Sequence, residues 1–225
     1  MLNEPANIPE SVTPRVVLVD DHDLFRTGLR NLLEEQHVQV VGECDNGTDA
    51  LRAVRELAPD VVVMDLNMPG ISGVEATRQI SMIAPLTRVL VLTISDQDSD
   101  VMDAILAGAC GYLLKDASIT ELMHGIQAAA VGESLVSPTI AAKVLQRVRA
   151  SGASHHEAQM IQSELSDREI QVLKLIANGK DNAMIAGELH ISPKTVKNHI
   201  SNILMKLQID NRIQAAVYAV RSGIV

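Results

Sequence analysis

Residues 15–20 read Arg-Val-Val-Leu-Val-Asp, an apolar run that ends in an acidic residue. Consecutive apolar residues without alternation are typical of a strand that is buried on both faces of a sheet. Similar runs occur at 38–42, 60–65, 88–93 and 109–114. Between and after these runs, apolar residues at helical spacing predict helices over 22–35, 47–57, 73–83, 97–107 and 118–131. Five alternations of strand and helix predict an α/β domain of (βα)5 type, with a doubly wound parallel sheet covered on both faces.

The composition is that of a globular protein rather than a disordered or membrane-spanning chain. Of the 225 residues, 47% are apolar and 21% are charged, which provides enough apolar mass for a core. No apolar run approaches the ~20 residues that span a bilayer, and the first residues lack the pattern of a signal peptide. The two cysteines lie far apart in apolar stretches, so we expect free thiols in a protein of the reducing cytoplasm.

Charge divides the chain into two parts. Residues 1–150 carry 21 acidic and 11 basic side chains, whereas residues 164–225 carry 6 and 8. Such an asymmetry predicts two modules with different partners. Residues 149–158 are small and polar, which is typical of a linker. We therefore predict a domain over 14–135, a linker over 136–162 and a second domain over 163–225. A helix near 138–150 could extend the first domain or pack between the two domains, or it could be a simple linker helix.

Polar residues lie where the predicted strands end. Asp20 and Asp21 close the first strand, Asp65 the third and Thr93 the fourth, and Lys115 follows the fifth. The carboxyl ends of parallel strands form the functional edge of an open sheet, so these side chains should converge. Three carboxylates in one cleft repel one another, and a hard divalent cation such as Mg²⁺ relieves that repulsion. Asp65 is then a candidate nucleophile that forms an aspartyl phosphate, with Lys115 and Thr93 contacting the phosphoryl oxygens.

Other chemistries have weaker support. Zinc is not expected, because the pattern brings no Cys or His to these carboxylates. Phosphohydrolases with an Asp nucleophile usually have a second Asp two residues later as general acid, and Asn67 cannot take that role. The chain has neither a G-x-G-x-x-G after its first strand nor a P-loop, so nucleotide binding lacks support. Taken singly, each aspartate could also be a helix cap or a solvated loop charge.

The second domain is predicted to be small and helical. Ser166 and Glu169 form a capping-box pattern before an apolar helix that Gly179 ends. A short helix over 182–189 and a helix from Pro193 to Leu207 follow, and a fourth helix covers about 211–221.

The second and third of these helices have the pattern of a helix-turn-helix. They are joined by a tight turn, and the third helix has a polar outer face that consists of Lys194, Lys197, Asn198 and Ser201. A helix of this kind lies in the major groove of DNA. The alternative is a helical bundle used for protein contacts, with a merely solvated polar face.

The first domain resembles a CheY-like receiver domain. The resemblance lies in Asp20-Asp21, in Asp65 before Leu-Asn-Met-Pro-Gly, in Thr93, and in Gly-Tyr-Leu-Leu-Lys115. It implies that Asp65 accepts a phosphoryl group from a sensor histidine kinase, and that Asp20, Asp21, Asp65 and the backbone carbonyl of Asn67 hold Mg²⁺. It also implies that Thr93 and Tyr112 form a switch pair. Asp116 follows Lys115 where many receivers have proline, which leaves the ammonium group in place.

The second domain resembles the LuxR-type helix-turn-helix. The matching stretches are Leu165-Ser-Asp-Arg-Glu169, Ala177-Asn-Gly-Lys180, Ile185-Ala-Gly-Glu-Leu189 and Ile191-Ser-Pro-Lys-Thr-Val-Lys-Asn-His-Ile200. The resemblance implies that Lys197, Asn198 and Ser201 face bases, while Lys194, Thr195 and Lys206 lie nearer the DNA backbone. It also implies a dimer that uses the last helix around Gln214, Val217, Tyr218 and Arg221. Ser201 is shorter than the lysine often found at its position.

Together the chain is similar to NarL/FixJ-type response regulators over nearly its whole length. This resemblance implies a cytoplasmic two-component response regulator that binds double-stranded promoter DNA as a homodimer and is controlled by Mg²⁺-dependent phosphorylation of Asp65. RNA polymerase is a further candidate partner. No enzymatic activity is implied beyond self-phosphorylation and slow self-dephosphorylation at Asp65.

Two alternatives to phosphorylation control stay open, namely a receiver that is never phosphorylated and acts through dimerisation, and a phosphatase-like enzyme. In the unphosphorylated protein we expect the receiver to cover the third helix of the second domain.

Overall fold

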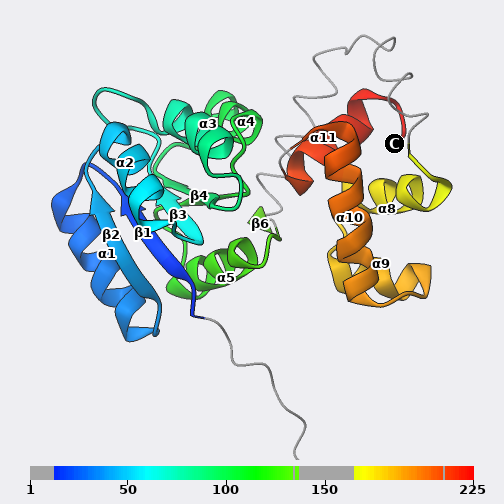
Figure 1. Cartoon of the computed structure of the whole chain (residues 1–225), viewed down its shortest axis with the longest axis horizontal. Helices are drawn as coiled ribbons and strands as arrows, with labels where there is room; N and C mark the ends of the chain where they lie inside the picture. The colour runs from blue at the N-terminus through cyan, green and yellow to red at the C-terminus, as the bar shows by residue number, and fades with distance from the viewer. Residues whose placement is uncertain (1–12, 134, 137–164, 210) are drawn as a thin grey trace, which may run out of the picture.

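The computed structural model describes residues 13–133, 135–136, 165–209 and 211–225, and it shows an α/β domain beside a helical domain (Figure 1). The predicted linker from residue 137 onward, with its helix near 138–150, lies outside the described residues. None of the helices in the described part of the chain is both long and apolar enough to cross a membrane.

The N-terminal domain has the predicted alternation of strands and helices. Its elements in chain order are β1 (Arg15–Val19), α1 (Asp23–Glu35), β2 (Gln39–Cys44), α2 (Gly47–Leu57), β3 (Val61–Met64), α3 (Gly73–Ile83), β4 (Arg88–Thr93), α4 (Asp98–Leu106), β5 (Gly111–Leu114) and α5 (Ile119–Ala130). Polar caps begin several helices: the side chains of Asn46 and Ser72 accept backbone N–H groups, and Ser118 forms a full capping box with Glu121.

The strands form one parallel sheet in the order β2-β1-β3-β4-β5-β6. The sixth strand, β6 (Leu135–Val136), was not predicted and adds two residues beside Gly111 and Tyr112 of β5. Two residues are too few to show a periodicity in the sequence. From β1 the chain adds β2 on one side of the sheet and then β3 to β6 on the other, so the strand order reverses between β1 and β3. Ligands bind in such sheets in the crevice at the carboxyl ends of the strands beside this reversal.

Helices cover both faces of the sheet, as predicted. On one face α1 and α5 bury Leu33 and Ile126 against alternate residues of the central strands. On the other face α2 and α3 bury Val54 and Ile80, and α4 contributes Ile105 to a neighbouring cluster. The runs of consecutive apolar residues arise because both faces of each central strand are buried.

The C-terminal domain has the four predicted helices, α8 (Asp167–Ala177), α9 (Asn182–Leu189), α10 (Pro193–Leu207) and α11 (Arg212–Arg221). Ser166 and Glu169 form the predicted capping box, and Pro193 occupies the first turn of α10. The turn between α9 and α10 passes through His190 in the left-handed conformation (φ 53°). A separate core, which includes Leu173, Ile185 and Ile203, joins the four helices.

The two domains touch through α11. Ile213 and Val217 of α11 share one buried cluster with residues of β4, α4 and β5. The side-chain amide of Asn211 donates to the carbonyl of Ala109 over 3.0 Å, and that of Gln214 donates to the carbonyl of Ile105 over 3.0 Å. The structure is therefore a closed arrangement in which α11 packs on the receiver-like domain.

Candidate functional site

Asp65 lies at the carboxyl end of β3, and its side chain is almost completely buried. Its Oδ1 accepts the backbone N–H of Leu66 at 2.7 Å, and its Oδ2 lies 2.7 Å from the Lys115 Nζ. Gly73 makes this loop possible, because a Cβ at that position would lie 2.0 Å from the Asp65 carbonyl oxygen. The first turn of α3 can therefore pack directly on the loop that carries Asp65.

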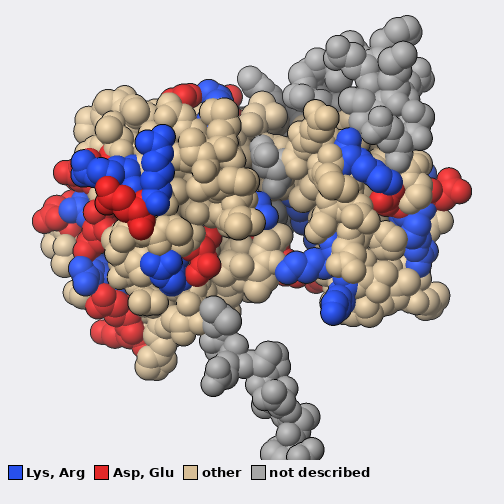
Figure 2. All heavy atoms as spheres, in the orientation of Figure 1, with Lys and Arg blue, Asp and Glu red and all other residues tan. Residues whose placement is uncertain are grey.

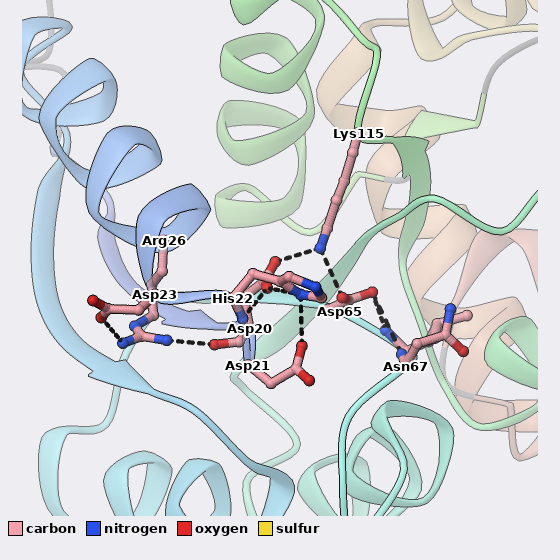
Figure 3. Close-up of polar contacts among 9 residues, drawn as sticks. Asp20, Asp21, His22, Asp23, Arg26, Asp65, Asn67 and Lys115 are labelled. Carbon is pink, nitrogen blue, oxygen red and sulfur yellow. Dashed lines mark hydrogen bonds and ion pairs between the residues drawn. The ribbon is translucent and has the colours of Figure 1, made fainter.

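Lys115 bridges two buried carboxylates. Its Nζ lies 2.7 Å from Asp20 Oδ2 and 2.7 Å from Asp65 Oδ2 (Figure 3). Burial alone would lower the pKa of Lys115, but the hydrogen bonds and charges of Asp65 and Asp20 outweigh burial and raise this pKa above its ordinary value. The lysine therefore carries a fixed positive charge beside the Asp65 oxygen atoms.

The carboxylates converge as predicted, and the structure adds a histidine to them. One ligand atom from each of Asp20, Asp21, His22 and Asp65 lies within 4.8 Å of the others. The expectation that no Cys or His joins the carboxylates is therefore wrong. Asn67 follows in the same loop, and its backbone N–H lies 3.4 Å from Asp65 Oδ1.

The donor set fits a magnesium ion. Asp20, Asp21 and Asp65 supply three carboxylates at one edge of the sheet, and oxygen atoms are the ligands that Mg²⁺ takes in proteins. One basic group, Lys115, neutralises only part of this charge. Such a site can hold a hard cation and receive a phosphoryl group beside it.

Two further residues shape the site, and neither was predicted from the sequence. The Nζ of Lys115 lies 4.6 Å from the ring centre of Phe25, within the range of a cation–π contact. Arg26 donates to the backbone carbonyl of Asp20 over 2.6 Å and pairs with Asp23 over 2.6 Å. Phe25 and Arg26 lie three and four residues after His22, in the first turn of α1, and this turn faces the carboxyl edge of the sheet. Their position directly after the first strand is the sequence signal that could have identified them.

Thr93 and Tyr112 lie close together on neighbouring strands, β4 and β5, and both are completely buried. The Thr93 hydroxyl lies 3.4 Å from the Ser95 backbone N–H, and the Tyr112 hydroxyl donates to the Ser95 carbonyl over 2.8 Å. Burial raises the pKa of Tyr112 well above its ordinary value. The predicted switch pair thus meets at one loop residue, with the tyrosine ring turned inward against the cluster that contains Ile213 and Val217.

The helix-turn-helix residues lie on α10 as predicted. Lys194, Lys197, Asn198 and Ser201 are exposed, while Thr195 and Lys206 are partly buried. Lys197 donates to the carbonyl of Val131 at the end of α5. Lys206 pairs with the buried carboxylate of Glu169 over 2.7 Å, so in this structure it joins α10 to α8.

The α10 face is partly covered by the first domain. Lys197, Ser201 and Arg212 line a pocket of about 260 Å³ together with residues of the α5 end, including Glu133. On the face shown in Figure 2 the helical domain displays mainly basic side chains, whereas the first domain also displays acidic patches. Basic side chains suit the phosphate backbone of DNA, and those of α10 that face the first domain become available to DNA only when that domain moves away.

Two of the α11 residues predicted for a dimer, Gln214 and Val217, lie against the first domain in this structure, whereas Tyr218 packs on the core of its own domain. Val217 is buried there, and Gln214 contributes one of the hydrogen bonds between the domains. Tyr218 is partly buried, which raises its pKa, and Arg221 is the last residue of the helix. A dimer through this surface requires α11 to leave the first domain.

Comparison with known proteins gives two family matches. Residues 16–127 match the response regulator receiver domain, and residues 163–219 match the luxR family of bacterial regulatory proteins. The transcriptional regulatory protein LiaR of Bacillus subtilis is 45% identical over 212 residues, which cover 94% of this chain and 99% of LiaR.

Solved structures show the same two-domain organisation. The response regulator ChrA of a heme-sensing two-component system is 36% identical, with a TM-score of 0.52 over 95% of this chain and 99% of ChrA. A structure of two RcsB dimers bound to two parallel DNAs is 26% identical, with a TM-score of 0.55 over 93% of this chain and 98% of RcsB.

Proposed function

Because this chain is a two-component response regulator of the NarL/FixJ type, with a receiver domain and a LuxR-type DNA-binding domain, we propose that phosphorylation of Asp65 controls its binding to promoter DNA. The phosphoryl donor is a sensor histidine kinase. The observation that supports the proposal most directly is the position of the buried Asp65 carboxylate, which lies beside the Lys115 ammonium group and close to the carboxylates of Asp20 and Asp21.

The transfer needs a nucleophile and charge compensation. An Asp65 oxygen forms a bond to phosphorus as the phosphorus–nitrogen bond to the kinase histidine breaks, and the leaving imidazole takes up a proton. The Lys115 ammonium then exchanges its contact with Asp65 for a phosphoryl oxygen, and the Thr93 hydroxyl donates to another. Mg²⁺, held by Asp20, Asp21, Asp65 and the Asn67 carbonyl, would supply the remaining positive charge.

The closed arrangement explains how this chemistry could regulate DNA binding. Lys197 and Ser201 of α10 face the end of α5, and Val217 of α11 is buried against the receiver. Tyr112 lies in the same buried cluster as Val217. A change at Thr93 and Tyr112 would therefore alter the surface on which α11 packs, and it would shift the population towards an open form that dimerises on DNA through α11.

We propose no catalytic role for the protein beyond its own phosphorylation and slow self-dephosphorylation. RNA polymerase is a further proposed partner of the DNA-bound dimer, and the proposed compartment is the cytoplasm.

The test is the mass of the intact protein after incubation with a small phosphodonor, with and without Mg²⁺, for the wild type and Asp65→Asn. We expect one added phosphoryl group that requires both Mg²⁺ and Asp65, together with an increase in affinity for promoter DNA. An adduct on Asp65→Asn, or a DNA affinity that phosphorylation leaves unchanged, would contradict the proposal.

A further inference from the structure

The pocket between the two domains is lined by more basic than acidic side chains. It has a volume of about 260 Å³ and lies where the start of β4 and the residues after α5 face α10 and the first residue of α11. Arg88, Lys197 and Arg212 line it, and Glu133 is the one acidic residue among the described residues that do so. Three basic side chains against one acidic side chain leave a formal excess of two positive charges.

The guanidinium group of Arg212 is held by neutral groups. Its Nη1 donates to the side-chain oxygen of Asn182 over 2.7 Å, and its Nη2 donates to the backbone carbonyl of Lys180. Within the described residues, no carboxylate oxygen lies within the 4.0 Å of an ion pair with this group. Burial lowers the pKa of Arg212, and the more distant charges of Glu133 and Asp181 only partly oppose this effect. A partly desolvated charge without a counter-ion is unfavourable, so an anion beside this group would stabilise it.

Glu133 contacts an amide instead of the guanidinium group. Its Oε1 accepts the Nδ2 of Asn182 over 2.8 Å, while the Oδ1 of the same amide accepts from Arg212. Lys197 also contacts a neutral group across the domain boundary, the carbonyl of Val131. Both basic side chains that the helical domain contributes to the pocket therefore lack a carboxylate partner among the residues that the structure describes.

The other lining residues determine what kind of anion fits. Leu86, Ile200 and Leu204 supply apolar surface, and Ser201 adds a hydroxyl group. Small-molecule sites combine apolar walls with a few polar groups in volumes of ~300–1,000 Å³, so this pocket suits a small ligand. Guanidinium groups bind phosphate oxygens through parallel N–H bonds, and a phosphate monoester is close to a dianion at neutral pH. A phosphate monoester with an apolar group matches both the charge and the walls of the pocket.

We propose that this pocket binds a small phosphate monoester that carries an apolar group, and that the ligand stabilises the closed form. The phosphate lies beside Arg212 and Lys197, and the apolar group lies against the leucine side chains. Because the binding residues come from both domains, opening separates them, and the ligand favours the closed form. Lys197 and Ser201 are then unavailable to DNA. The ligand therefore lowers the affinity for DNA, and DNA lowers the affinity for the ligand by the same factor.

Binding is measured by calorimetry on the full chain with phenyl phosphate as the probe. Inorganic phosphate and phenol are measured in parallel, because each contains one half of the probe, and a chelator removes divalent cations from the carboxylates near Asp65. Phenyl phosphate should bind at one site per chain and more tightly than inorganic phosphate, and phenol should show no saturable binding. No phosphoryl group is transferred to Asp65 in this experiment, so the inference and the proposed control by phosphorylation can fail independently. Only the effect on DNA rests on the proposed function.

Two matched pairs of charge variants locate the bound probe. Lys197→Gln should weaken binding by at least about fivefold, because a charge-assisted hydrogen bond is lost. Lys174→Gln removes the same charge from an exposed position of α8 and should change the affinity less than about twofold. Glu133→Gln should strengthen binding by about threefold or more, because it removes a negative charge from the pocket while its amide oxygen can still accept the Asn182 N–H. Glu56→Gln, at an exposed position of α2, should leave the affinity unchanged.

The effect on DNA is measured with a double-stranded fragment that the wild type binds, at constant ionic strength because DNA affinity depends on salt. Saturating phenyl phosphate should lower the DNA affinity of the unphosphorylated protein several-fold. Glu133→Gln should reach this effect at a lower probe concentration than wild type, and Glu56→Gln at the same concentration.

Absence of saturable binding by phenyl phosphate would overturn the inference. Equal losses of affinity in Lys197→Gln and Lys174→Gln would show that the probe lies on the basic surface in general, and equal affinities of Glu133→Gln and wild type would also place it outside the pocket. The expected gain in Glu133→Gln cannot arise from a loss of folding. If the probe binds as expected and DNA affinity stays the same, the ligand does not hold the closed form, and that part of the inference is wrong.

Discussion

At the scale of single residues, the chemistry at the carboxyl edge of the sheet depends on how the Lys115 ammonium group is held. Lys115 reaches Asp20 and Asp65 from the loop after β5, and Phe25 lies beneath its Nζ at 4.6 Å. The aromatic ring restricts where the ammonium group can move when Lys115 exchanges its contact with Asp65 for a phosphoryl oxygen. Phe25 is thus a positioning residue that acts through Lys115.

Phe25→Leu should slow phosphorylation without removing the acceptor. A cation–π contact contributes about 0.5–2 kcal/mol, so we expect a few-fold lower initial rate of phosphoryl incorporation from a small phosphodonor, measured by intact mass. Leu24→Ala is the matched control, because Leu24 is the neighbouring residue on α1 and is almost fully exposed. Equal rates in both variants would show that the ring does not position Lys115.

The sequence predicted the acidic residues and the lysine of the site, but not His22, Phe25 and Arg26. Asp20, Asp65 and Lys115 are visible because each follows a strand whose apolar run is plain in the sequence. The roles of His22 and Phe25 depend on the rotation of α1 about its axis and on side-chain directions. The spacing of apolar residues predicts which face of the helix is buried, but it does not predict where a single side chain on that helix points.

At the scale of elements, close approach of α3 to the Asp65 loop determines which residue can begin the helix. Gly73 starts α3, and a Cβ there would meet the Asp65 carbonyl oxygen at 2.0 Å and the Leu66 Cα at 2.7 Å. These are backbone atoms, so they cannot move aside as a flexible side chain would. The helix or the loop that carries Asp65 must shift instead.

Gly73→Ala should therefore destabilise the receiver and disturb the acceptor. Overpacking of this kind costs about 1–3 kcal/mol, measured as the loss in free energy of unfolding, and the rate of phosphorylation should fall as well. Gly28→Ala is the control, since no atom lies within 4 Å of a Cβ at that position of α1. That substitution should stabilise the protein by about 0.5–1 kcal/mol, the usual gain from replacing glycine in a helix.

A second element-scale contact joins α8 to α10 and predicts a pH dependence. Burial would raise the pKa of Glu169, but the hydrogen bonds from Lys206 and Ser166 outweigh burial and lower this pKa below its ordinary value. A carboxylate with a lowered folded-state pKa stabilises the protein above its unfolded-state pKa, and this contribution is lost as pH falls through the folded-state pKa.

Glu169→Gln tests that contact. At neutral pH it should reduce the free energy of unfolding by about 1–3 kcal/mol, because Lys206 loses its partner but still reaches solvent. The difference between wild type and variant should begin to shrink as pH falls below the ordinary glutamate pKa of about 4.3, and it should be lost as pH falls through the lower folded-state pKa, where the folded carboxyl group becomes protonated. Denaturant unfolding at several pH values measures this, and a difference that is constant with pH would contradict it.

The sequence predicted most elements within one or two residues, because the central strands are buried on both faces and the helices carry clear caps. It missed β6, whose two residues pair with Gly111 and Tyr112. That strand exists because β5 offers a free edge, which is a property of the sheet and not of residues 135–136. The same limit applies to Lys206: the resemblance implies a contact with the DNA backbone, and the sequence pattern does not show the ion pair with Glu169 that the structure contains.

At the scale of the whole molecule, the arrangement of the two domains depends on α11. The apolar side of this helix buries Ile213 and Val217 against the receiver, whereas the resemblance to LuxR-type domains assigns the same helix to a dimer. An apolar helix face shows that something covers it, but the sequence pattern does not distinguish a surface of the same chain from one of a second copy. The closed form and the dimer therefore compete for one surface.

Asn211→Asp should shift this competition towards the open form. The Asn211 Oδ1 caps α11 by accepting the N–H groups of Ile213 and Gln214, while its Nδ2 donates to the Ala109 carbonyl. Aspartate retains the capping oxygen and replaces the donor with a charged oxygen against a buried carbonyl, which costs about 1–3 kcal/mol in the closed form alone. The helix should therefore stay folded while the interface between the domains weakens.

Small-angle scattering of the unphosphorylated protein should show a larger radius of gyration for Asn211→Asp than for wild type, and DNA affinity should rise several-fold without phosphorylation. Asn178→Asp adds the same charge at an exposed position after α8, so it controls for the change in net charge. A larger radius without a gain in DNA affinity would mean that the docking of α11 does not limit DNA binding. An unchanged radius would mean that the closed form does not depend on the Asn211 amide. A gain in both quantities, absent from Asn178→Asp, would identify release of α11 as the step that phosphorylation of Asp65 has to drive.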